Sequence, residues 1–539
     1  MKFLRTLYHL ARADFLERVR RSSFLVLAGF TVYMGYLFVP PAGANYQTVS
    51  LGDARGIYNS PWVGTMFGIM ISTLMTLVAF FPIKNAVTRD RQTRVGQIVA
   101  TTPMRKPVYL LGKWLSNVAV LALLMLIMTL MALVMQWVRA EDLHVDVWAL
   151  VLPIWLIGFP ALTVVAALAV LFECIPFLQG GLGNIVYFFL YMTILIISIE
   201  GTTDANGSLR PSNDLFGISH PIADMQRVIM HYDPDYKGAL IIGGAELSES
   251  PLRFPWEGIV WTFDLVMQRL SWIALAILIT LGAVLPFDRF DPARQRIPHK
   301  RKRHKDRVSD EQIANDLSSN ASSVSPYVTL TPLPNCRSHW RFGTVLQAEL
   351  RLMLKGQPWW WYTVAGGLII ASAVVPPEVA ATALAFVWLW PILIWSPMGA
   401  REVQSFAQEL VFSVAHPLRR QLAATWLAGV GVALLMASGG LARAAITGEV
   451  ARVLAILTGV GFVPSLALAL GVWSRSSRLF EVAYLTLWYI AFNGVPALDF
   501  MGMNREGMRQ RYTFAYLGLT VLLLIVAILG RWRALERHT

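Results

Sequence analysis

The sequence predicts an all-α protein that crosses a membrane many times. Of its 539 residues, 55% are hydrophobic and only 15% are charged, whereas soluble globular chains carry about 25% charged residues. The mean hydropathy is +0.52. Apolar runs of about twenty residues recur along the chain, and each is long enough to cross a hydrocarbon layer of roughly 30 Å. We therefore expect a multi-pass protein of the cell membrane, inner or plasma.

Twelve apolar runs, separated by polar segments, predict about twelve transmembrane helices. They are residues 24–39, 61–83, 111–138, 147–172, 184–200, 266–286, 359–376, 379–398, 422–442, 453–473, 480–498 and 512–530. The first six fall within residues 24–286 and the last six within residues 359–530. Between these sets lies the basic stretch 287–340, which has too few apolar residues to bury a core, so we expect a flexible cytoplasmic linker.

The distribution of charge predicts the orientation. The net charge is +13, and Lys and Arg collect in residues 84–113, in the linker 287–340 and in the tail 531–539. The loop 201–258 is acidic instead. Because basic loops stay in the cytoplasm, we expect both termini inside and the loop 201–258 outside. The linker charges then suit anionic lipid head groups better than nucleic acid, and we expect no nucleic-acid partner.

Motifs for catalysis, metal binding and nucleotide binding are missing from the sequence. No G-x-x-x-x-G-K-[ST] stretch occurs, the nine histidines form no H-E-x-x-H pattern, and there is no nucleophile elbow. The two cysteines, Cys174 and Cys336, suggest neither a disulfide framework nor a metal site. We expect both to be free thiols on the cytoplasmic side. We expect no enzyme activity and no cofactor in this chain.

Residues 1–23 and 341–358 each precede a set of six spans and predict amphipathic helices. In the first of them, apolar residues recur every four positions, which makes one apolar stripe. The stripe consists of Phe3, Leu7, Ala11, Phe15 and Val19. Such a helix lies along a membrane surface. The alternative is an ordinary juxtamembrane helix with no partner.

The two sets of six spans repeat one pattern. Arg89-Asp90 recurs 312 residues later as Arg401-Glu402, and Ala13-Asp14 recurs 335 residues later as Ala348-Glu349. A third match places "NIVYFFLYM" over "EVAYLTLWY", a shift of 297 residues that aligns Tyr187 with Tyr484. We therefore expect two parallel six-helix halves, related by an axis along the membrane normal.

The basic segment "TRDRQTRVGQIVATTPMRKPVYLLGKW", Thr88 to Trp114, is longer than a turn requires. Its Arg and Asp offer charged hydrogen-bond partners to another protein. The alternative is that its charges only enforce topology. A topology signal needs Lys and Arg but no repeated acidic partner, so we favour a docking site.

These features together resemble the permease of a type-2 ATP-binding cassette (ABC) exporter. The family pattern falls on Arg89, Asp90, Gly96, Pro103, Arg105, Lys106, Gly112 and Lys113. The second half keeps Arg401, Glu402, Pro417, Arg419 and Arg420, but Gln408 replaces the glycine and Thr425 the lysine. Most permeases of this family have one six-span unit and dimerise. This chain is similar to a fused pair, as in exporters of antibiotics or polyketides.

The resemblance implies export driven by two separate ATPase subunits, which hold ATP and magnesium and dock on residues 84–113 and 399–421. It also implies that spans two, five, eight and eleven line the pathway. Those spans offer Met66, Phe67, Met70, Tyr187, Tyr191, Tyr484 and Trp488. This mixture suits a lipophilic or amphiphilic small molecule or lipid. The alternative is that these residues face lipid or pack between helices.

Two other functions fit the same span count. A secondary transporter of the major facilitator type also has twelve spans in two parallel halves, but "RDRQTR" lacks the glycines of its loop signature. Such a transporter would also favour ionisable residues in mid-span, whereas those here lie near span ends. They are Glu173, Asp264, Glu481 and Asp499. A membrane scaffold or sensor without transport is the other alternative.

The segment after each fifth span carries one short motif. "DLFG" at Asp214–Gly217 resembles "DFMG" at Asp499–Gly502, which predicts that both fifth spans end in the same turn. The acidic loop 201–258 is found only in the first half. We expect it to fold into a small cap over the exit of the pathway.

Overall fold

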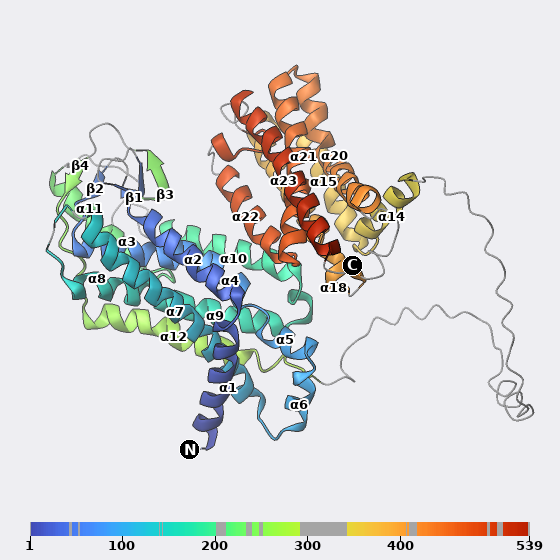
Figure 1. The fold of residues 1–539 in the computed structure, drawn as a ribbon. Helices are drawn as coiled ribbons and strands as arrows, with labels where there is room; N and C mark the ends of the chain where they lie inside the picture. Colours follow the sequence, from blue (N-terminus) through green and yellow to red (C-terminus); the bar gives the residue numbers. More distant parts are fainter. Residues whose placement is uncertain are drawn as a thin grey trace, which may run out of the picture.

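The computed structural model is about 80% helical (Figure 1). It describes residues 2–41, 46–51, 54–139, 141–142, 144–200, 212–232, 240–246, 252–290, 342–405, 407–408, 418–492, 496–503 and 510–536. Within these ranges, eight helical segments are long and apolar enough to cross a membrane, and a ninth results if one bent pair counts as a single span. The chain is therefore a helical membrane protein, as its composition predicts.

The described part of residues 2–290 forms the N-terminal bundle. Its helices are α1 (Lys2–Val19), α2 (Ser22–Phe38), α3 (Ser60–Met70), the π-helical turn η1 (Ile71–Met75), α4 (Thr76–Ile83), α5 (Ala86–Gln92), α6 (Val95–Thr101), α7 (Lys106–Arg139), α8 (Val147–Pro153), the π-helical turn η2 (Ile154–Gly158), α9 (Phe159–Cys174), α10 (Gly181–Glu200), α11 (Ser219–Tyr232) and α12 (Phe263–Gly282). The axes of α1 and α2 differ by 77°, so α1 does not continue the first apolar helix. It packs against α7 instead.

The described part of residues 342–536 forms the C-terminal bundle. Its main helices are α14 (Phe342–Leu354), α15 (Trp359–Val374), α16 (Pro377–Leu389), α17 (Ile392–Trp395), α18 (Arg401–Gln404), the π-helical turn η5 (Leu418–Leu422), α20 (Ala423–Ile446), α21 (Val450–Ser474), α22 (Arg478–Phe492) and α23 (Gln510–Glu536). The packing repeats that of the N-terminal bundle: α14 lies on α20 as α1 lies on α7, and α23 lies on α21 as α12 lies on α9.

Every predicted apolar run coincides with a helix, but not every helix is long enough to cross a membrane unaided. The four short ones are α2, α15, α16 and α22, with 17, 16, 13 and 15 residues. A span needs about 20 residues. The crossing of the other eight segments is supported by their length, whereas a count of twelve stays a prediction.

Segments within residues 46–56 and 240–254 form a small β-sheet. Its strands are β1 (Tyr46–Leu51), β2 (Ala54–Gly56), β3 (Leu240–Glu246) and β4 (Leu252–Phe254), in the order β3-β1-β2-β4. β1 pairs antiparallel with β2 and β3, and β2 pairs parallel with β4. The sheet and α11 lie together at one end of the bundle (Figure 1). The described parts of the loop 201–258 are folded, whereas their position over the exit of a pathway stays a prediction; the all-α prediction missed this sheet and its two strands from residues 46–56.

A buried ion pair ties the sheet to the helices. Arg55 makes two hydrogen bonds to the Glu141 carboxylate, at 2.7 and 2.8 Å, and Arg253 donates a third at 3.1 Å. Burial favours the neutral acid, but these bonds from Arg55, together with one from the Tyr58 N–H, favour the carboxylate and lower the pKa of Glu141. β2 and β4 are thereby fixed to the loop that follows α7.

The two D-x-x-G motifs form similar turns, as predicted. Gly217 and Gly502 both have positive φ, at 67° and 72°, a conformation in which a side chain is strained. The Asp214 carboxylate accepts from the Ile218 N–H at 3.0 Å. The Asp499 carboxylate accepts from the Met501 and Met503 N–H groups, each at 3.2 Å. In both turns an aspartate holds the loop backbone that the glycine reverses.

Arg269 of α12 is buried and donates to four backbone carbonyls. It donates to Leu156 and Ile157 of η2, both at 3.2 Å, and to Asp214 and Leu215 at 2.5 and 2.9 Å. Pro160 has no N–H for the Leu156 carbonyl four residues earlier, and Arg269 donates to that carbonyl. This side chain joins α9, α12 and the first D-x-x-G turn.

Replacing Arg269 with methionine should therefore destabilise the N-terminal bundle by about 3 kcal/mol, because buried carbonyls lose their donor. Thermal unfolding in detergent measures the effect. Arg227→Met is the matched control, since the Arg227 side chain is 62% exposed and its loss should change stability by about 0.5 kcal/mol or less. Equal unfolding temperatures for the two variants would contradict this account of Arg269.

Candidate functional site

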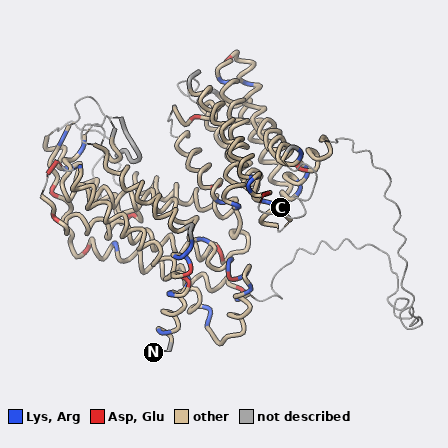
Figure 2. Tube along the Cα trace, viewed as in Figure 1, with Lys and Arg blue, Asp and Glu red and all other residues tan. Residues whose placement is uncertain are grey.

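The segment between the second and third apolar helices of the N-terminal bundle is held by charged residues. Lys, Arg, Asp and Glu gather where α1, α5 and the start of α7 meet (Figure 2). The backbone reverses at Asn85 and at Arg94, which have φ of 103° and 62°. Asn adopts this left-handed region more readily than most residues, and Arg rarely does. These two reversals place α5 and α6 across the end of the bundle.

Glu173, at the end of α9, fixes the start of α5. Its carboxylate accepts from four consecutive backbone N–H groups, those of residues 85 to 88, at 2.6, 2.9, 2.7 and 2.8 Å. The first N–H groups of a helix have no partner inside the helix and carry partial positive charge. A buried carboxylate in this position therefore gains four hydrogen-bond donors, and the N–H groups at the start of α5 gain an acceptor.

Asp14, Arg89, Asp90, Tyr109 and Lys113 form what we call the first anchor cluster. Lys113 Nζ lies 2.9 Å from Asp14 and 2.8 Å from Asp90, Arg89 lies 2.5 Å from Asp14, and the Tyr109 hydroxyl donates to Asp90 at 2.7 Å. Asp14, Asp90, Tyr109 and Lys113 are buried. The cluster joins α1, α5 and α7, since each of these helices contributes at least one member.

The Asp14 carboxylate has more partners than any other acid of the cluster. Arg18 and Ser116 add ion-pair and hydrogen-bond contacts at 2.9 and 2.8 Å. Burial alone would raise the pKa of Asp14, but the charges of Arg18 and Lys113 and the bonds from Lys113 and Ser116 outweigh it and lower the pKa to about 2. Asp14 is therefore ionised at neutral pH and stabilises the fold in that form.

Equivalent positions in the C-terminal bundle form the second anchor cluster, with different chemistry. It consists of Glu349, Arg401, Glu402, Gln421 and Arg531. Arg401 lies 3.6 Å from Glu349. Glu402 accepts from Gln421 at 3.1 Å and from Arg531 at 3.0 Å. Gln421 follows Tyr109 by 312 residues, and both side chains donate to the acidic residue of the repeated pair.

The main difference between the clusters is the missing lysine. Thr425 occupies the position of Lys113 and carries no charge. Burial raises the pKa of Glu349, Arg401 lowers it, and the nearby Glu402 raises it again, so the net shift is upward. Arg531 comes from α23, the last helix, and provides a buried cation that the first cluster obtains from α7.

Several predicted site residues have structural roles. A Cβ on Gly96 would lie 2.7 Å from the Phe290 ring, and one on Gly112 would lie 2.5 Å from Leu10, so both glycines permit close packing. Lys106 donates to the Phe287 carbonyl at 2.7 Å. Pro103 and Arg105 are exposed. Of the remaining ones, Arg420 is half-buried, whereas Pro417 and the Arg419 side chain lie outside the described residues.

Arg89 and Asp90 contact residues of this chain, and the exposed surface lies beside them on α6. Val95 and Ile98 are 44% and 66% exposed, and they lie three residues apart on one face of α6. Gln92, Arg94 and Gln97 are exposed around them. An apolar pair with a polar rim on a short helix suits contact with another protein.

The seven predicted pathway residues are buried, among them Met66, Phe67 and Met70 of α3. The four on α10 and α22 hydrogen-bond to neighbouring helices. Tyr187 donates to the Thr76 carbonyl at 2.7 Å and Tyr191 to the Thr73 carbonyl at 2.8 Å. Tyr484 and Trp488 donate at 2.8 Å to Trp388 and Ala385. These residues therefore pack between helices, and their lining of a pathway stays a prediction.

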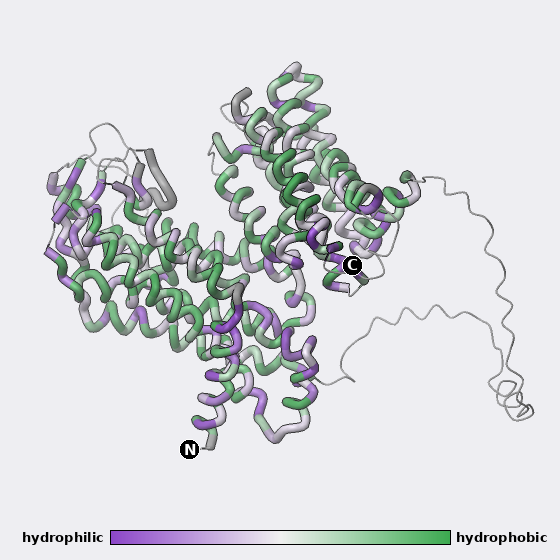
Figure 3. Tube along the Cα trace, in the orientation of Figure 1, coloured by the Kyte–Doolittle hydropathy of each residue, from purple (hydrophilic) through white to green (hydrophobic). Residues whose placement is uncertain are grey.

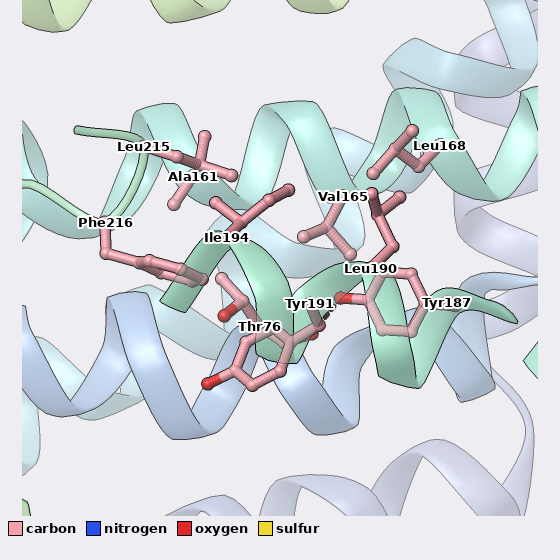
Figure 4. Close-up of a pocket in the computed structure, with 10 residues that line it drawn as sticks. All are labelled: Thr76, Ala161, Val165, Leu168, Tyr187, Leu190, Tyr191, Ile194, Leu215 and Phe216. Atoms are coloured by element: carbon pink, nitrogen blue, oxygen red, sulfur yellow. Dashed lines mark hydrogen bonds between the residues drawn. The ribbon is translucent and has the colours of Figure 1, made fainter. Parts of the chain in front are cut away.

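An apolar hollow lies beside α10, between α9 and the first D-x-x-G turn (Figure 4). Its lining residues are Thr76, Ala161, Val165, Leu168, Tyr187, Leu190, Tyr191, Ile194, Leu215 and Phe216. The Tyr187 hydroxyl is already bonded to Thr76, so the hollow presents almost only hydrocarbon and aromatic surface. The free space is only about that of one water molecule. Figure 3 shows that apolar residues dominate the helices around it.

Among the residues that the structure describes, no group of three or more His, Cys, Asp or Glu side chains could hold a metal ion. Cys174 is a buried free thiol, and Cys336 lies outside the described residues. A scan against protein-family models and a search of the curated proteins found no match to this chain.

Sequence reasoning missed three of the residues that hold the site, namely Asp14, Glu173 and Arg531. In the sequence, Asp14 stands out only as part of the repeat, and Glu173 only as a charge near a span end. A charged residue at the end of an apolar run is costly unless it is paired. That cost is the signal that could have singled out Glu173 as a partner of residues 84–113 and Arg531 as a partner of residues 399–421.

The two clusters predict opposite responses to the removal of one charge. The ionised form of Asp14 stabilises the fold above its unfolded pKa of 3.8, and this contribution is lost as pH falls toward about 2. Asp14→Asn should therefore cost about 2 kcal/mol at neutral pH. Because the pKa of Glu349 is raised, its neutral form is favoured in the folded chain, and Glu349→Gln should be tolerated or stabilising. Thermal unfolding at pH 7 in detergent checks both variants, and an equal loss in both would contradict the assignment.

Proposed function

We propose that this chain is the membrane permease of an ABC exporter. It moves a lipophilic or amphiphilic substrate outward and is driven by separate ATPase subunits that dock on residues 84–113 and 399–421. In this proposal the chain crosses the membrane twelve times in two parallel halves, with both termini in the cytoplasm. The observation that carries the proposal is the pair of anchor clusters. One lies on residues 84–113 and the other on residues 399–421, which we call the first and second connecting segments.

The two-half arrangement is supported by hydrogen bonds that recur at the offsets of the sequence repeat. Tyr484 follows Tyr187 by 297 residues, and its acceptor Trp388 follows Thr76 by 312 residues. The same offsets relate the Tyr191–Thr73 bond to the bond between Trp488 and Ala385. The fifth helix of each bundle is therefore joined to the second at equivalent carbonyls. Chance similarity of apolar segments would not reproduce donor and acceptor together.

The anchor clusters support the proposal that a cytoplasmic partner transmits its movement to the helices of this chain. A segment that only sets topology needs no buried contacts, yet the first connecting segment is bonded to α1, α7 and α9. A displacement of α6 by a partner would therefore move α1 and α7 together with it. This is the mechanical connection that an external ATPase requires, because hydrolysis occurs on another subunit.

The contacts of Arg89 and Asp90 change which residues we assign to docking. Both side chains bond to other residues of this chain, so their role is to position residues 84–113. We assign the docking surface to Val95 and Ile98 on the exposed face of α6. The second segment has Gln408 in place of Gly96 and no lysine at Thr425, so the two docking sites are not equivalent.

The two alternatives are a secondary transporter of the major facilitator type and a membrane scaffold or sensor. Neither gives a reason for the two anchor clusters. The facilitator would transport as a purified chain in liposomes with no ATPase present. The scaffold would recruit partners without moving a solute. Transport that requires a co-purifying ATPase separates the permease from both.

The docking proposal is tested by capture of partners on the tagged, full-length chain from membranes of its source cells. Wild-type chain should recover a protein with a G-x-x-x-x-G-K-[ST] loop, identified by mass spectrometry. Val95→Glu together with Ile98→Glu should reduce recovery at least tenfold, because two carboxylates would enter an apolar contact.

The control for this capture is Ile446→Glu with Val450→Glu. These residues are 87% and 68% exposed and lie at the end of α20 and the start of α21, away from the second anchor cluster. The control should recover the ATPase normally. Equal recovery with both double variants, together with full transport by the chain alone, would exclude the ABC permease.

The orientation is tested by single cysteines at Ser208 and Ser318, in a chain without Cys174 and Cys336. The charge distribution predicts Ser208 outside and Ser318 in the cytoplasm. An impermeant maleimide added to intact cells should label only the cysteine at residue 208, and permeabilised cells should label both. Labelling of the two positions from the same side would refute the twelve-span arrangement.

A further inference from the structure

The two bundles meet along α10 and α22. Most of this contact is aromatic: Phe188 packs on Trp488 with ring centres 6.1 Å apart, and Phe189 stacks on Phe386 at 6.5 Å. At one end of it lie four polar side chains, Lys84, Asn184, Ser396 and Glu481, which we call the interbundle cluster. Each is at most 4% exposed. Buried polar groups in an apolar contact are costly, so their partners decide how the surfaces fit.

The four side chains form one continuous network across the boundary. Lys84 Nζ donates to the Asn184 side-chain oxygen at 2.8 Å and to the Gly180 carbonyl at 3.1 Å. The Asn184 amide donates to the Glu481 carboxylate, which also bonds to Ser396. A chain of hydrogen bonds thus runs from a cation in one bundle to an anion in the other.

The approach of the bundles here is close. A Cβ on Gly181 would lie 2.7 Å from Leu393 and 2.9 Å from the Glu481 carboxylate. Arg478 of α22 also reaches across the boundary, at 3.5 Å from the Lys84 carbonyl. Little space is left for water to solvate an unpaired charge at this place.

The members occupy two pairs of equivalent positions. Ser396 follows Lys84 by 312 residues and Glu481 follows Asn184 by 297 residues, which are the offsets of the internal repeat. Their chemistry nevertheless differs: the N-terminal bundle brings a lysine and an amide, and the C-terminal bundle brings a hydroxyl and a carboxylate. The two surfaces are therefore complementary to each other and not to themselves.

We propose that the interbundle cluster selects the pairing of the N-terminal half with the C-terminal half, so that one chain forms the permease and like halves of two chains do not pair. This inference rests on the proposed two-half permease. Pairing two N-terminal halves would bring two copies of Lys84 together in place of Lys84 and Glu481, with only Glu173 of each half as a nearby anion. Pairing two C-terminal halves would bring two copies of Glu481 together in place of Lys84 and Glu481, with only Arg478 of each half as a nearby cation. Like charges that face each other in a buried contact are strongly unfavourable.

The test measures the distance between the halves in the full-length chain in lipid nanodiscs. Spin labels are placed at Trp137→Cys and Ile446→Cys, both exposed and at the far ends of α7 and α20, in a chain without Cys174 and Cys336. The chain with native Lys84 and Glu481 should give one narrow distance distribution by pulsed electron paramagnetic resonance. Glu481→Lys should broaden it, because two buried cations then face each other.

Two further variants separate charge pairing from general damage. Lys84→Met with Glu481→Gln removes both charges and leaves an acceptor for Asn184, so the narrow distribution should return. Asp264→Lys makes the same charge change at an exposed position and should leave the distribution unchanged. A narrow distribution in Glu481→Lys, or one in the double variant as broad as in Glu481→Lys, would overturn the proposal.

Pairing between chains is measured with the label at Trp137→Cys alone. The proposal predicts only the background of randomly placed chains, and a defined distance between chains would overturn it. These measurements do not involve an ATPase. The selection of halves can therefore fail while ATPase recovery persists, and loss of ATPase recovery in the Val95 and Ile98 variant leaves these distances unaffected.

Discussion

Lys113 lies buried between the carboxylates of Asp14 and Asp90, and the arrangement of the connecting segment depends on this contact. A buried charge is tolerated only when it is paired with good geometry. Asp14, Asp90 and Lys113 come from α1, α5 and α7. Because Lys113 bonds to both carboxylates, these three helices are held in one arrangement relative to one another. The amphipathic helix, the connecting segment and the third apolar helix thus become one rigid unit. In the proposed exporter, this unit receives the movement of an ATPase.

The same requirement explains the other buried charges of the N-terminal bundle. Glu173 accepts from the free N–H groups at the start of α5, and Arg269 donates to carbonyls of η2 and of the first D-x-x-G turn. No water is present in a bilayer core to satisfy such groups. Each interruption of a helix therefore needs a side chain from another helix. These side chains are what connect α5 to α9, and α9 to α12.

The two anchor clusters solve one problem with different residues. The first takes its central cation from α7, whereas the second lacks that lysine and takes Arg531 from the last helix, α23. Glu349 is consequently less well paired than Asp14, and the pKa values of the two carboxyls shift in opposite directions. In a two-ATPase exporter, the second docking segment would transmit movement to the end of the chain. The proposed coupling is therefore asymmetric.

The sequence alone determined the helices, including the two that precede the sets of apolar runs, the internal repeat and the paired D-x-x-G turns. These features depend on apolar periodicity and local turn chemistry, which a few neighbouring residues specify. It did not determine that Arg89 and Asp90 bond within the chain, that residues 46–56 join residues 240–254 in a sheet, or that Lys84 and Glu481 meet in one network. Those partners are far apart in sequence, and many charged residues could pair equally well on local grounds. Only the packing of helices brings one particular pair of charged residues together. It also excludes the water that would otherwise solvate these charges.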